Sequence, residues 1–109
     1  MPELGYFLSS EEHGPRQLAR IAEQAEHAGF RSVLISDHYH PWIDRQGESP
    51  FVWSVIGAIA ASTGLKVTTG VTCPTVRIHP AVLAQAAATS MLLLEGRFVF
   101  GLGSGEALN

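Results

Sequence analysis

The sequence predicts an α/β fold in which the strands run parallel and alternate with helices. Short apolar runs that suit strands begin near residues 4, 32, 66 and 97. Between them lie stretches whose apolar residues recur at three- and four-residue steps, which is typical of amphipathic helices. The repeat of roughly thirty residues matches one strand–helix unit, and such units place neighbouring strands in parallel.

The first unit opens with the apolar run LGYFL at residues 4–8, followed by a polar loop at residues 9–14. Pro15 suits the first position of a helix because its φ is already helical and it lacks the N–H that would stay unpaired there. The apolar face of this helix recurs at helical spacing and consists of Leu18, Ile21, Ala22, Ala25 and Ala28. Gly29 fits the position just past the helix end.

The second unit begins with a strand at residues 32–35 and runs directly into the motif SDHYHPW at residues 36–42. A polar loop at residues 43–49 follows. Ser49 as N-cap and Pro50 as first helical residue predict a second helix that extends to about Ser62.

The third unit starts with a β-branched strand at residues 65–71, which Cys73 and Pro74 interrupt. A third helix is predicted from Pro80 to near Gly96. A fourth strand at residues 97–102 then leads into a glycine-rich segment at residues 103–109.

Strands this apolar need cover on both faces, as in a barrel or a doubly wound sheet. A complete (βα)8 TIM barrel takes about 250 residues, whereas this chain has 109. We therefore expect residues 1–109 to form a single partial domain, the first half of such a barrel, in the order β-α-β-α-β-α-β.

The composition excludes several classes of protein. A hydrophobic fraction of 46% and a charged fraction of 16% indicate a well-buried globular protein. The net charge of −3 and the scattered basic residues argue against a surface for nucleic acid or for anionic membranes. Cys73 is the single cysteine, which fits a reducing compartment, and neither a signal peptide nor an apolar run of about 20 residues is evident. We expect a cytoplasmic protein that binds a small molecule.

Side chains capable of chemistry follow the second strand, at the position where parallel α/β proteins bind ligands. His38 could act as a general acid or base near neutral pH, or it could be a structural histidine bonded to a backbone carbonyl. His38 and His40 share a face of an extended segment, but two ligands are too few for a metal site, and we expect none. Trp42 could stack on a flat ligand or simply cap the barrel.

Two further strand ends carry glycine-rich segments. Gly70 indicates either a bulge with close backbone approach to a ligand or a simple strand terminator. Alternate glycines at residues 101–105 allow close approach of a ligand, although their spacing differs from the nucleotide-binding pattern GxGxxG. Glu106 could act as an acid against a bound heterocycle or be an ordinary first-turn residue of a following helix.

Four segments together carry a family resemblance: SDHYHPW, TGVTCPT, RIHPAVLAQAAAT and GRFVFGLGSGEALN. The chain resembles the deazaflavin (coenzyme F420)-dependent oxidoreductases of the bacterial-luciferase-like superfamily, in particular the branch that includes F420-dependent glucose-6-phosphate dehydrogenase. This resemblance implies the N-terminal portion of a longer (βα)8 barrel, usually dimeric. It also implies that the deazaflavin binds at the C-terminal mouth and that hydride transfer takes place at its C5.

The resemblance assigns three catalytic roles. His38 would take the proton from the substrate hydroxyl, Trp42 would lie against the substrate and the ring, and Glu106 would protonate the reduced ring near N1. The residues implied to contact the cofactor are Asp37, Gly70, Val71, Cys73, Ser104, Gly105 and Asn109. Among these, Gly70 and Val71 match a bulge with a non-prolyl cis peptide, and Cys73 replaces a threonine of the best-known relatives.

The function implied is that of an F420-dependent oxidoreductase acting on a hydroxyl- or aldehyde-type substrate, with glucose 6-phosphate as one candidate. One alternative is an FMN-dependent luciferase-like monooxygenase. Another is a truncated, non-catalytic half barrel that self-associates. We expect the 109-residue chain by itself to have little activity, because half a barrel supplies only part of the cofactor cleft.

Overall fold

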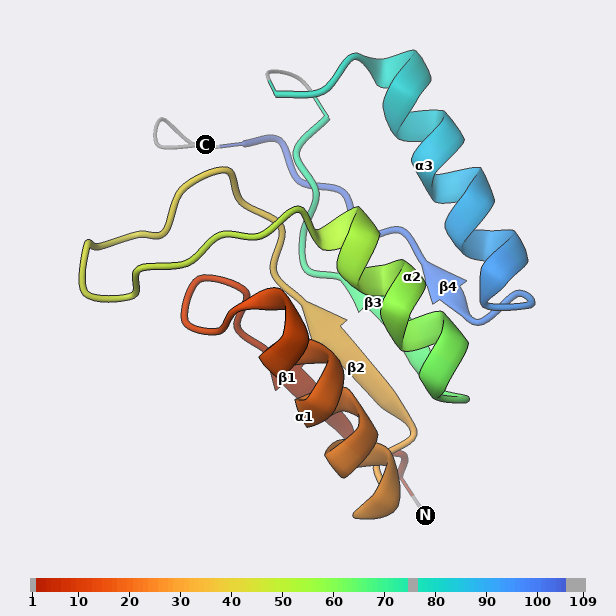
Figure 1. Cartoon of the computed structure of the whole chain (residues 1–109). Coiled ribbons are helices and arrows are strands. Elements are labelled where there is room, and N and C mark those ends of the chain that lie inside the picture. The colour runs from red at the N-terminus through yellow and green to blue at the C-terminus, as the bar shows by residue number, and fades with distance from the viewer. Residues whose placement is uncertain (1, 75–76, 106–109) are drawn as a thin grey trace.

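The computed structural model describes residues 2–74 and 77–105. These residues form four strands that alternate with three helices: β1 (Gly5–Leu8), α1 (Pro15–His27), β2 (Ser32–Ile35), α2 (Val52–Ser62), β3 (Lys66–Thr69), α3 (Pro80–Leu93) and β4 (Phe98–Val99). The strands make one parallel sheet in the order β1-β2-β3-β4 (Figure 1). The predicted order of elements and the parallel sheet are confirmed.

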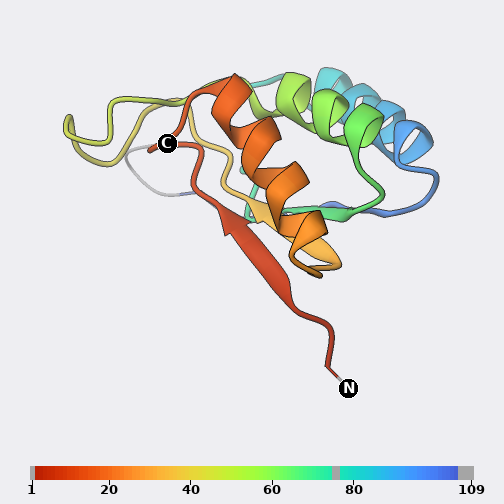
Figure 2. The ribbon, with the colours of Figure 1, turned by 60° about the horizontal axis from the view of Figure 1, so that its bottom comes forward.

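All three helices of the described residues lie on one face of the sheet (Figure 2). The register places Val33, Val67 and Phe98 in one row across β2, β3 and β4, and all three are buried. Alternate side chains of a strand point to opposite faces, so this row belongs to the helix-covered face. The helices complete the core with their own buried apolar residues, chiefly Leu18, Ala22, Val52, Val55, Ile56, Ile59 and Leu83.

The opposite face of the sheet has no helix over it within the described residues (Figure 2). Phe7, Leu34 and Val99 lie in one row on that face, and their exposed fractions are 51%, 39% and 44%. Apolar side chains in such a row fill the interior when a parallel sheet closes into a barrel. The chain therefore presents the inner surface of an incomplete barrel.

The start of α2 differs from the prediction. The helix begins at Val52 with Phe51 as N-cap, and no side chain caps it, whereas Ser49 and Pro50 were expected to open it. The hydroxyl of Ser49 instead donates to the backbone carbonyl of His38, at 2.5 Å. A tertiary hydrogen bond has displaced the local capping role, and it ties the end of the loop to the segment that follows β2.

The ends of β3 and β4 also differ from the prediction, since both strands are shorter than residues 65–71 and 97–102. The Oγ1 of Thr69 donates to the carbonyl of Gly101 and accepts from its N–H, both at 3.0 Å, in place of ladder bonds. A Cβ at Gly101 would lie 1.9 Å from the carbonyl oxygen of Thr69, so the two strands approach too closely for any side chain there. Pairing resumes as a single bridge between Thr72 and Leu102.

Other helix ends agree with the sequence. Gly29 follows the C-cap residue of α1 with a φ of +100°, a conformation that glycine adopts without a Cβ clash. Pro80 is the first residue of α3, and Nδ1 of His79 accepts from the N–H of Ala81 at 3.1 Å. The cap at His79 fixes where the loop between β3 and α3 ends, and Gly29 fixes where α1 ends.

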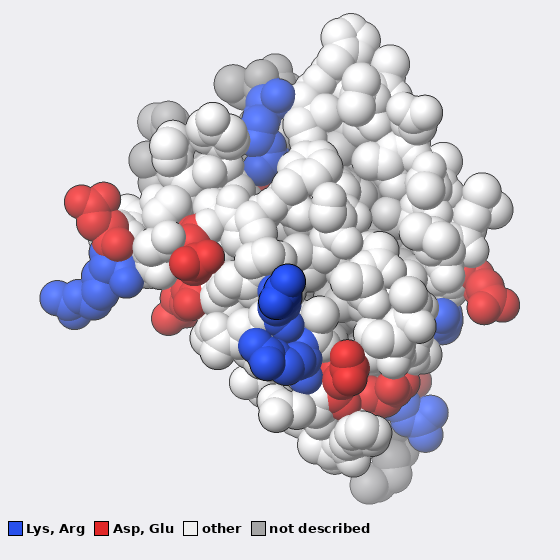
Figure 3. Space-filling model, viewed as in Figure 1, with Lys and Arg blue, Asp and Glu red and all other residues white. Residues whose placement is uncertain are grey.

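The outer surface of α2 and α3 is free of charge, because neither helix contains Asp, Glu, Lys or Arg. Figure 3 shows the corresponding white area, with the charged side chains gathered over other parts of this face. No helix among the described residues is both long enough and apolar enough to cross a membrane.

Candidate active site

The carboxyl ends of the four strands meet at one end of the sheet because all of them run in the same direction (Figure 1). The segments that follow these ends are Ser10 and Glu11 after β1, residues 36–38 after β2, residues 70–73 after β3 and residues 100–105 after β4. We call these segments the carboxyl edge.

His38 faces a carboxylate at this edge. Its Nδ1 lies 3.1 Å from Oε2 of Glu11, and the two side chains are 12% and 5% exposed. Because a carboxylate only accepts hydrogen bonds, Nδ1 is the donor and carries the hydrogen. An imidazole in this tautomer has its basic lone pair on Nε2. The contact with Glu11 therefore fixes the orientation of the His38 ring at the carboxyl edge.

Glu11 is itself held by two serine hydroxyls. Ser36 Oγ donates to Oε1 and Ser10 Oγ donates to Oε2, each at 2.9 Å. A buried carboxylate is costly unless hydrogen bonds satisfy it, and with His38 these bonds supply three donors. Ser10 and Ser36 also contact each other, at 3.0 Å between their hydroxyl oxygens. This network fixes the carboxylate and, through it, the His38 ring.

Sequence reasoning treated Glu11 only as part of a polar loop. A signal was present, since Ser-Ser-Glu follows the first strand directly, and carboxyl ends of parallel strands share one edge. The pattern could not decide between Glu11 and its neighbour Glu12. The structure places Glu11 at 4% exposure and leaves Glu12 exposed.

Trp42 lies beside His38. The ring centroids are 5.2 Å apart with an interplanar angle of 75°, an edge-to-face contact. The Trp42 side chain remains 48% exposed, so part of its surface is open at the carboxyl edge. The side-chain oxygen of Gln46 accepts from the backbone N–H of Trp42 at 2.7 Å and holds this turn of the loop.

Asp37 bonds to two residues that follow β3, on the other side of β2 from β1. Its Oδ2 accepts from the hydroxyl of Thr72 at 2.7 Å, and its Oδ1 accepts from Nη2 of Arg77 at 2.6 Å. The side chain of Asp37 is only 1% exposed. Two adjacent residues after β2 thus contact different neighbours: His38 contacts Glu11 in the segment after β1, and Asp37 contacts residues that follow β3.

The peptide bond between Gly70 and Val71 is cis, which confirms what the family resemblance implied. A Cβ at Gly70 would lie 2.6 Å from Cδ1 of Leu34, so the backbone here packs directly on β2. Val71 and Leu102 are 41% and 59% exposed. The backbone at Gly70 is thus close-packed, while the neighbouring apolar side chains of Val71 and Leu102 are exposed at the carboxyl edge.

The remaining predicted residues are distributed as follows. Cys73 is half-buried and borders a small recess of about 10 Å³ together with Asp37, Tyr39 and Arg77. Ser104 and Gly105 are exposed beyond β4. Glu106 and Asn109 lie outside the described residues. The predicted residues that belong to the carboxyl edge are therefore Asp37, His38, Gly70, Val71, Cys73, Ser104 and Gly105, and Trp42 lies beside His38.

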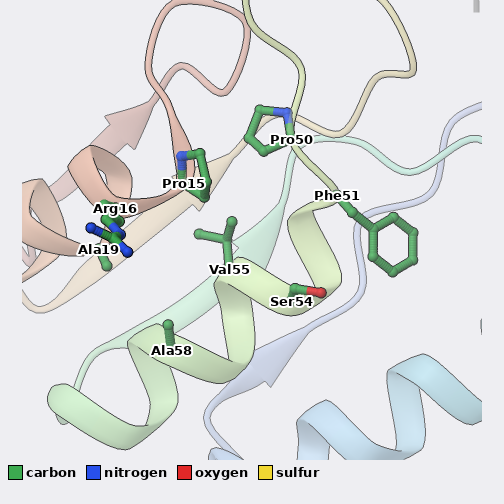
Figure 4. Close-up of a pocket in the computed structure, with 8 residues that line it drawn as sticks. All are labelled: Pro15, Arg16, Ala19, Pro50, Phe51, Ser54, Val55 and Ala58. Atoms are coloured by element: carbon green, nitrogen blue, oxygen red, sulfur yellow. The ribbon is translucent and has the colours of Figure 1, made fainter.

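Within residues 2–74 and 77–105, no cluster of three or more His, Cys, Asp or Glu is placed to hold a metal ion. A larger groove of about 350 Å³ lies away from the carboxyl-edge residues, between the start of α1 and α2 (Figure 4). Its lining is mostly apolar and consists of Pro15, Arg16, Ala19, Pro50, Phe51, Ser54, Val55 and Ala58. None of these residues belongs to the carboxyl edge.

Known proteins resemble this chain over nearly its whole length. F420-dependent glucose-6-phosphate dehydrogenase of Amycolatopsis mediterranei is 46% identical over 110 residues, covering 100% of this chain and 33% of that protein. F420-dependent hydroxymycolic acid dehydrogenase of Mycobacterium tuberculosis is 46% identical over 107 residues, covering 97% of this chain and 30% of that protein. The chain spans about a third of the length of these relatives.

A solved structure shows the same fold. It is an F420-dependent secondary alcohol dehydrogenase in complex with an F420-acetone adduct, with a TM-score of 0.91 and 38% sequence identity. The match covers 98% of this chain and 33% of that one. Residues 2–109 also match the family model described as Luciferase-like monooxygenase. The chain therefore belongs to the luciferase-like family, whose members include F420-dependent dehydrogenases.

Proposed function

We propose that this chain is the N-terminal part of an F420-dependent oxidoreductase that transfers a hydride between a hydroxyl- or aldehyde-type substrate and a bound deazaflavin. The observation that carries the proposal is the Glu11–His38 pair, 3.1 Å apart beside the ring of Trp42. Similarity to F420-dependent dehydrogenases over the whole chain supports the same conclusion.

Alcohol oxidation requires a base at the hydroxyl proton while the hydride leaves the carbon. When bound, the deazaflavin supplies a hydride acceptor at C5. His38 would take the proton through Nε2, because Nδ1 is directed at Glu11. The Glu11 carboxylate stabilises the imidazolium that forms, and it keeps the ring in one orientation throughout.

The residues that would hold the cofactor follow β3 and β4. Val71, Leu102 and the backbone at Gly70 provide an apolar surface for a flat ring. We further propose Glu106 as the acid toward that ring and Cys73, Ser104, Gly105 and Asn109 as cofactor contacts. Trp42 would cover the substrate, since its exposed surface lies beside His38.

The substrate is proposed as a small alcohol. The relatives are named for glucose 6-phosphate, hydroxymycolic acid and secondary alcohols, and a hydroxyl-bearing carbon is common to all of them. Glucose 6-phosphate is the first to test, because several of the relatives are named for it.

The test uses the full-length protein that contains this chain. Purified protein should bind F420 and reduce it when glucose 6-phosphate or a secondary alcohol is added, measured by the loss of F420 absorbance. FMN serves as the control ligand, and the absorption spectrum of the bound cofactor distinguishes the two. Tight binding of FMN with no binding of F420 would favour the monooxygenase alternative and contradict the proposal.

We also propose that the full-length protein is a cytoplasmic homodimer. The uncharged surface of α2 and α3 supports association, because apolar and uncharged patches mark protein contacts. A groove between these helices is lined by Phe51, Val82 and Leu93 among others. Val82→Lys should shift the sedimentation coefficient toward that of the monomer, whereas an unchanged coefficient would argue against this surface.

A further inference from the structure

We propose that Arg77 is a positioning residue of the site: through its ion pair with Asp37 it holds the segment after β3 against the end of β2. Arg77 touches neither His38 nor Trp42 in any described contact, and it acts through Asp37. The proposal rests on the proposed function, since it concerns how the cofactor-binding surface is kept in place.

The first step is the burial of the Asp37 carboxylate. At 1% exposure it cannot rely on water, and its described partners are Thr72 on Oδ2 and Arg77 on Oδ1. Of these two, only Arg77 brings a positive charge. Removal of one partner from a buried ion pair leaves an uncompensated charge, which destabilises its surroundings strongly.

The second step concerns the segments after β3 and β4, which Asp37 holds in place through its hydrogen bond with Thr72. The N–H of Thr72 donates to the carbonyl of Gly101 at 2.7 Å, and the N–H of Gly103 donates to the carbonyl of Thr72 at 2.9 Å. Thr72 therefore links the segments after β3 and β4 where the regular ladder has ended. A carboxylate displaced from Thr72 would loosen both segments, including Val71 and Leu102 on the cofactor-facing surface.

The third step is that Asp37 directly precedes His38 in the chain. A shift of the Asp37 carboxylate toward solvent moves the backbone that also carries the base. His38 has its own anchor in Glu11, so we expect the larger effect of losing Arg77 on cofactor binding and the smaller effect on the chemical step.

The chain offers a matched control in Arg97. This arginine is also half-buried, and its Nη1 donates to the carbonyl of Leu65 at 2.9 Å, bridging β3 and β4 at the opposite end of the sheet. Arg77→Gln and Arg97→Gln thus each remove one positive charge that bonds to a neighbouring strand segment. Arg77 joins the residues after β3 to the end of β2, and Arg97 joins β4 to the start of β3 at the opposite end of the sheet. Only the first should affect the site.

The experiment compares these variants in the full-length protein. Arg77→Gln should weaken F420 binding by about tenfold or more, because small misplacements in a site are costly, while Arg97→Gln should leave the dissociation constant unchanged. The double variant Asp37→Asn/Arg77→Gln replaces the pair with two neutral amides that can bond to each other. It should recover part of the hydrogen-exchange protection that Arg77→Gln loses at the amides of Thr72 and Gly103, as expected when the damage in the single variant is an unpaired charge.

A second readout needs no cofactor. Hydrogen exchange at the amides of Thr72 and Gly103 should accelerate in Arg77→Gln and not in Arg97→Gln. If the wild-type protein fails to bind F420, the proposed function falls, and amide exchange alone decides the role of Arg77. Equal effects of the two arginine variants on exchange, or no recovery of exchange protection in the double variant, would overturn the proposal.

Discussion

Glu11 and His38 are 27 positions apart in the sequence, yet Oε2 of the one lies 3.1 Å from Nδ1 of the other. The contact joins the segment after β1 to the segment after β2. It orients the imidazole and places a negative charge where the protonated ring would need it. The proposed base and the carboxylate that orients it therefore come from segments that follow adjacent parallel strands.

Glu11→Gln in the full-length protein should lower kcat by roughly 10²-fold, within the range that general-base catalysis contributes. The amide keeps the size of the side chain and can still accept from Nδ1, while the hydroxyl of Ser36 can rotate to accept from the new NH₂. The negative charge beside the imidazolium is lost. Steady-state kinetics would measure the effect, and F420 affinity should stay close to that of the wild type.

Glu12→Gln is the matched control, since it makes the same change at the neighbouring, exposed position. It should leave kcat unchanged. Equal activity of the two variants would show that the contact between Glu11 and His38 has no part in the reaction.

His38→Ala should reduce turnover by about 10² to 10⁴-fold, because it removes the proposed base outright. Cofactor binding should persist, as the surface formed by Val71 and Leu102 is unaffected. His40→Ala, two residues further along the same loop, is the control and should retain turnover. Substantial activity in His38→Ala would remove this histidine from the mechanism.

The order of strands and helices could be predicted because local signals agree with the tertiary structure. Pro15, Gly29 and Pro80 occupy the helix ends that their backbone preferences favour. Ser49 shows the limit of such signals, because its hydroxyl bonds to the carbonyl of His38 in place of capping α2. Local propensity could not foresee a partner eleven positions away in the sequence.

The candidate site could be predicted in part. His38 and Trp42 stand out because a cluster of polar and aromatic residues follows a buried strand. Arg77 gives no comparable signal, since its partner Asp37 lies 40 positions earlier in the sequence and the pairing depends on the sheet register. Pairings of this kind become visible only once the strands are placed side by side.

Two glycines should respond to alanine in opposite ways. Gly101→Ala places a Cβ 1.9 Å from the carbonyl oxygen of Thr69, so β3 and β4 must separate, and we expect a loss of about 1–3 kcal/mol, as for overpacking. Gly57 lies within α2 and a Cβ there meets no atom within 4 Å. Gly57→Ala should stabilise the protein by about 0.5–1 kcal/mol. Denaturant unfolding of both variants measures whether the free energy of unfolding falls in Gly101→Ala and rises in Gly57→Ala. A higher free energy of unfolding in Gly101→Ala would contradict the close approach of the strands.

The open face of the sheet should control the behaviour of the 109-residue chain in isolation. Phe7, Leu34 and Val99 expose a row of apolar surface, and β1 and β4 each have a strand edge without a partner among the described residues. Both features promote association, so we expect species larger than a dimer of the 11.7 kDa chain and little turnover.

Sedimentation velocity on this isolated chain measures the association. The double variant Phe7→Lys/Val99→Lys places two charges on the open face and should shift the distribution toward smaller species, because burying unpaired lysines is costly. Ile43→Lys, at an equally exposed apolar residue in the loop after β2, should leave the distribution unchanged. A wild-type chain that sediments as a monomer would show that the open face of the sheet does not drive association. Turnover of substrate by that monomer would show that four strands suffice for catalysis.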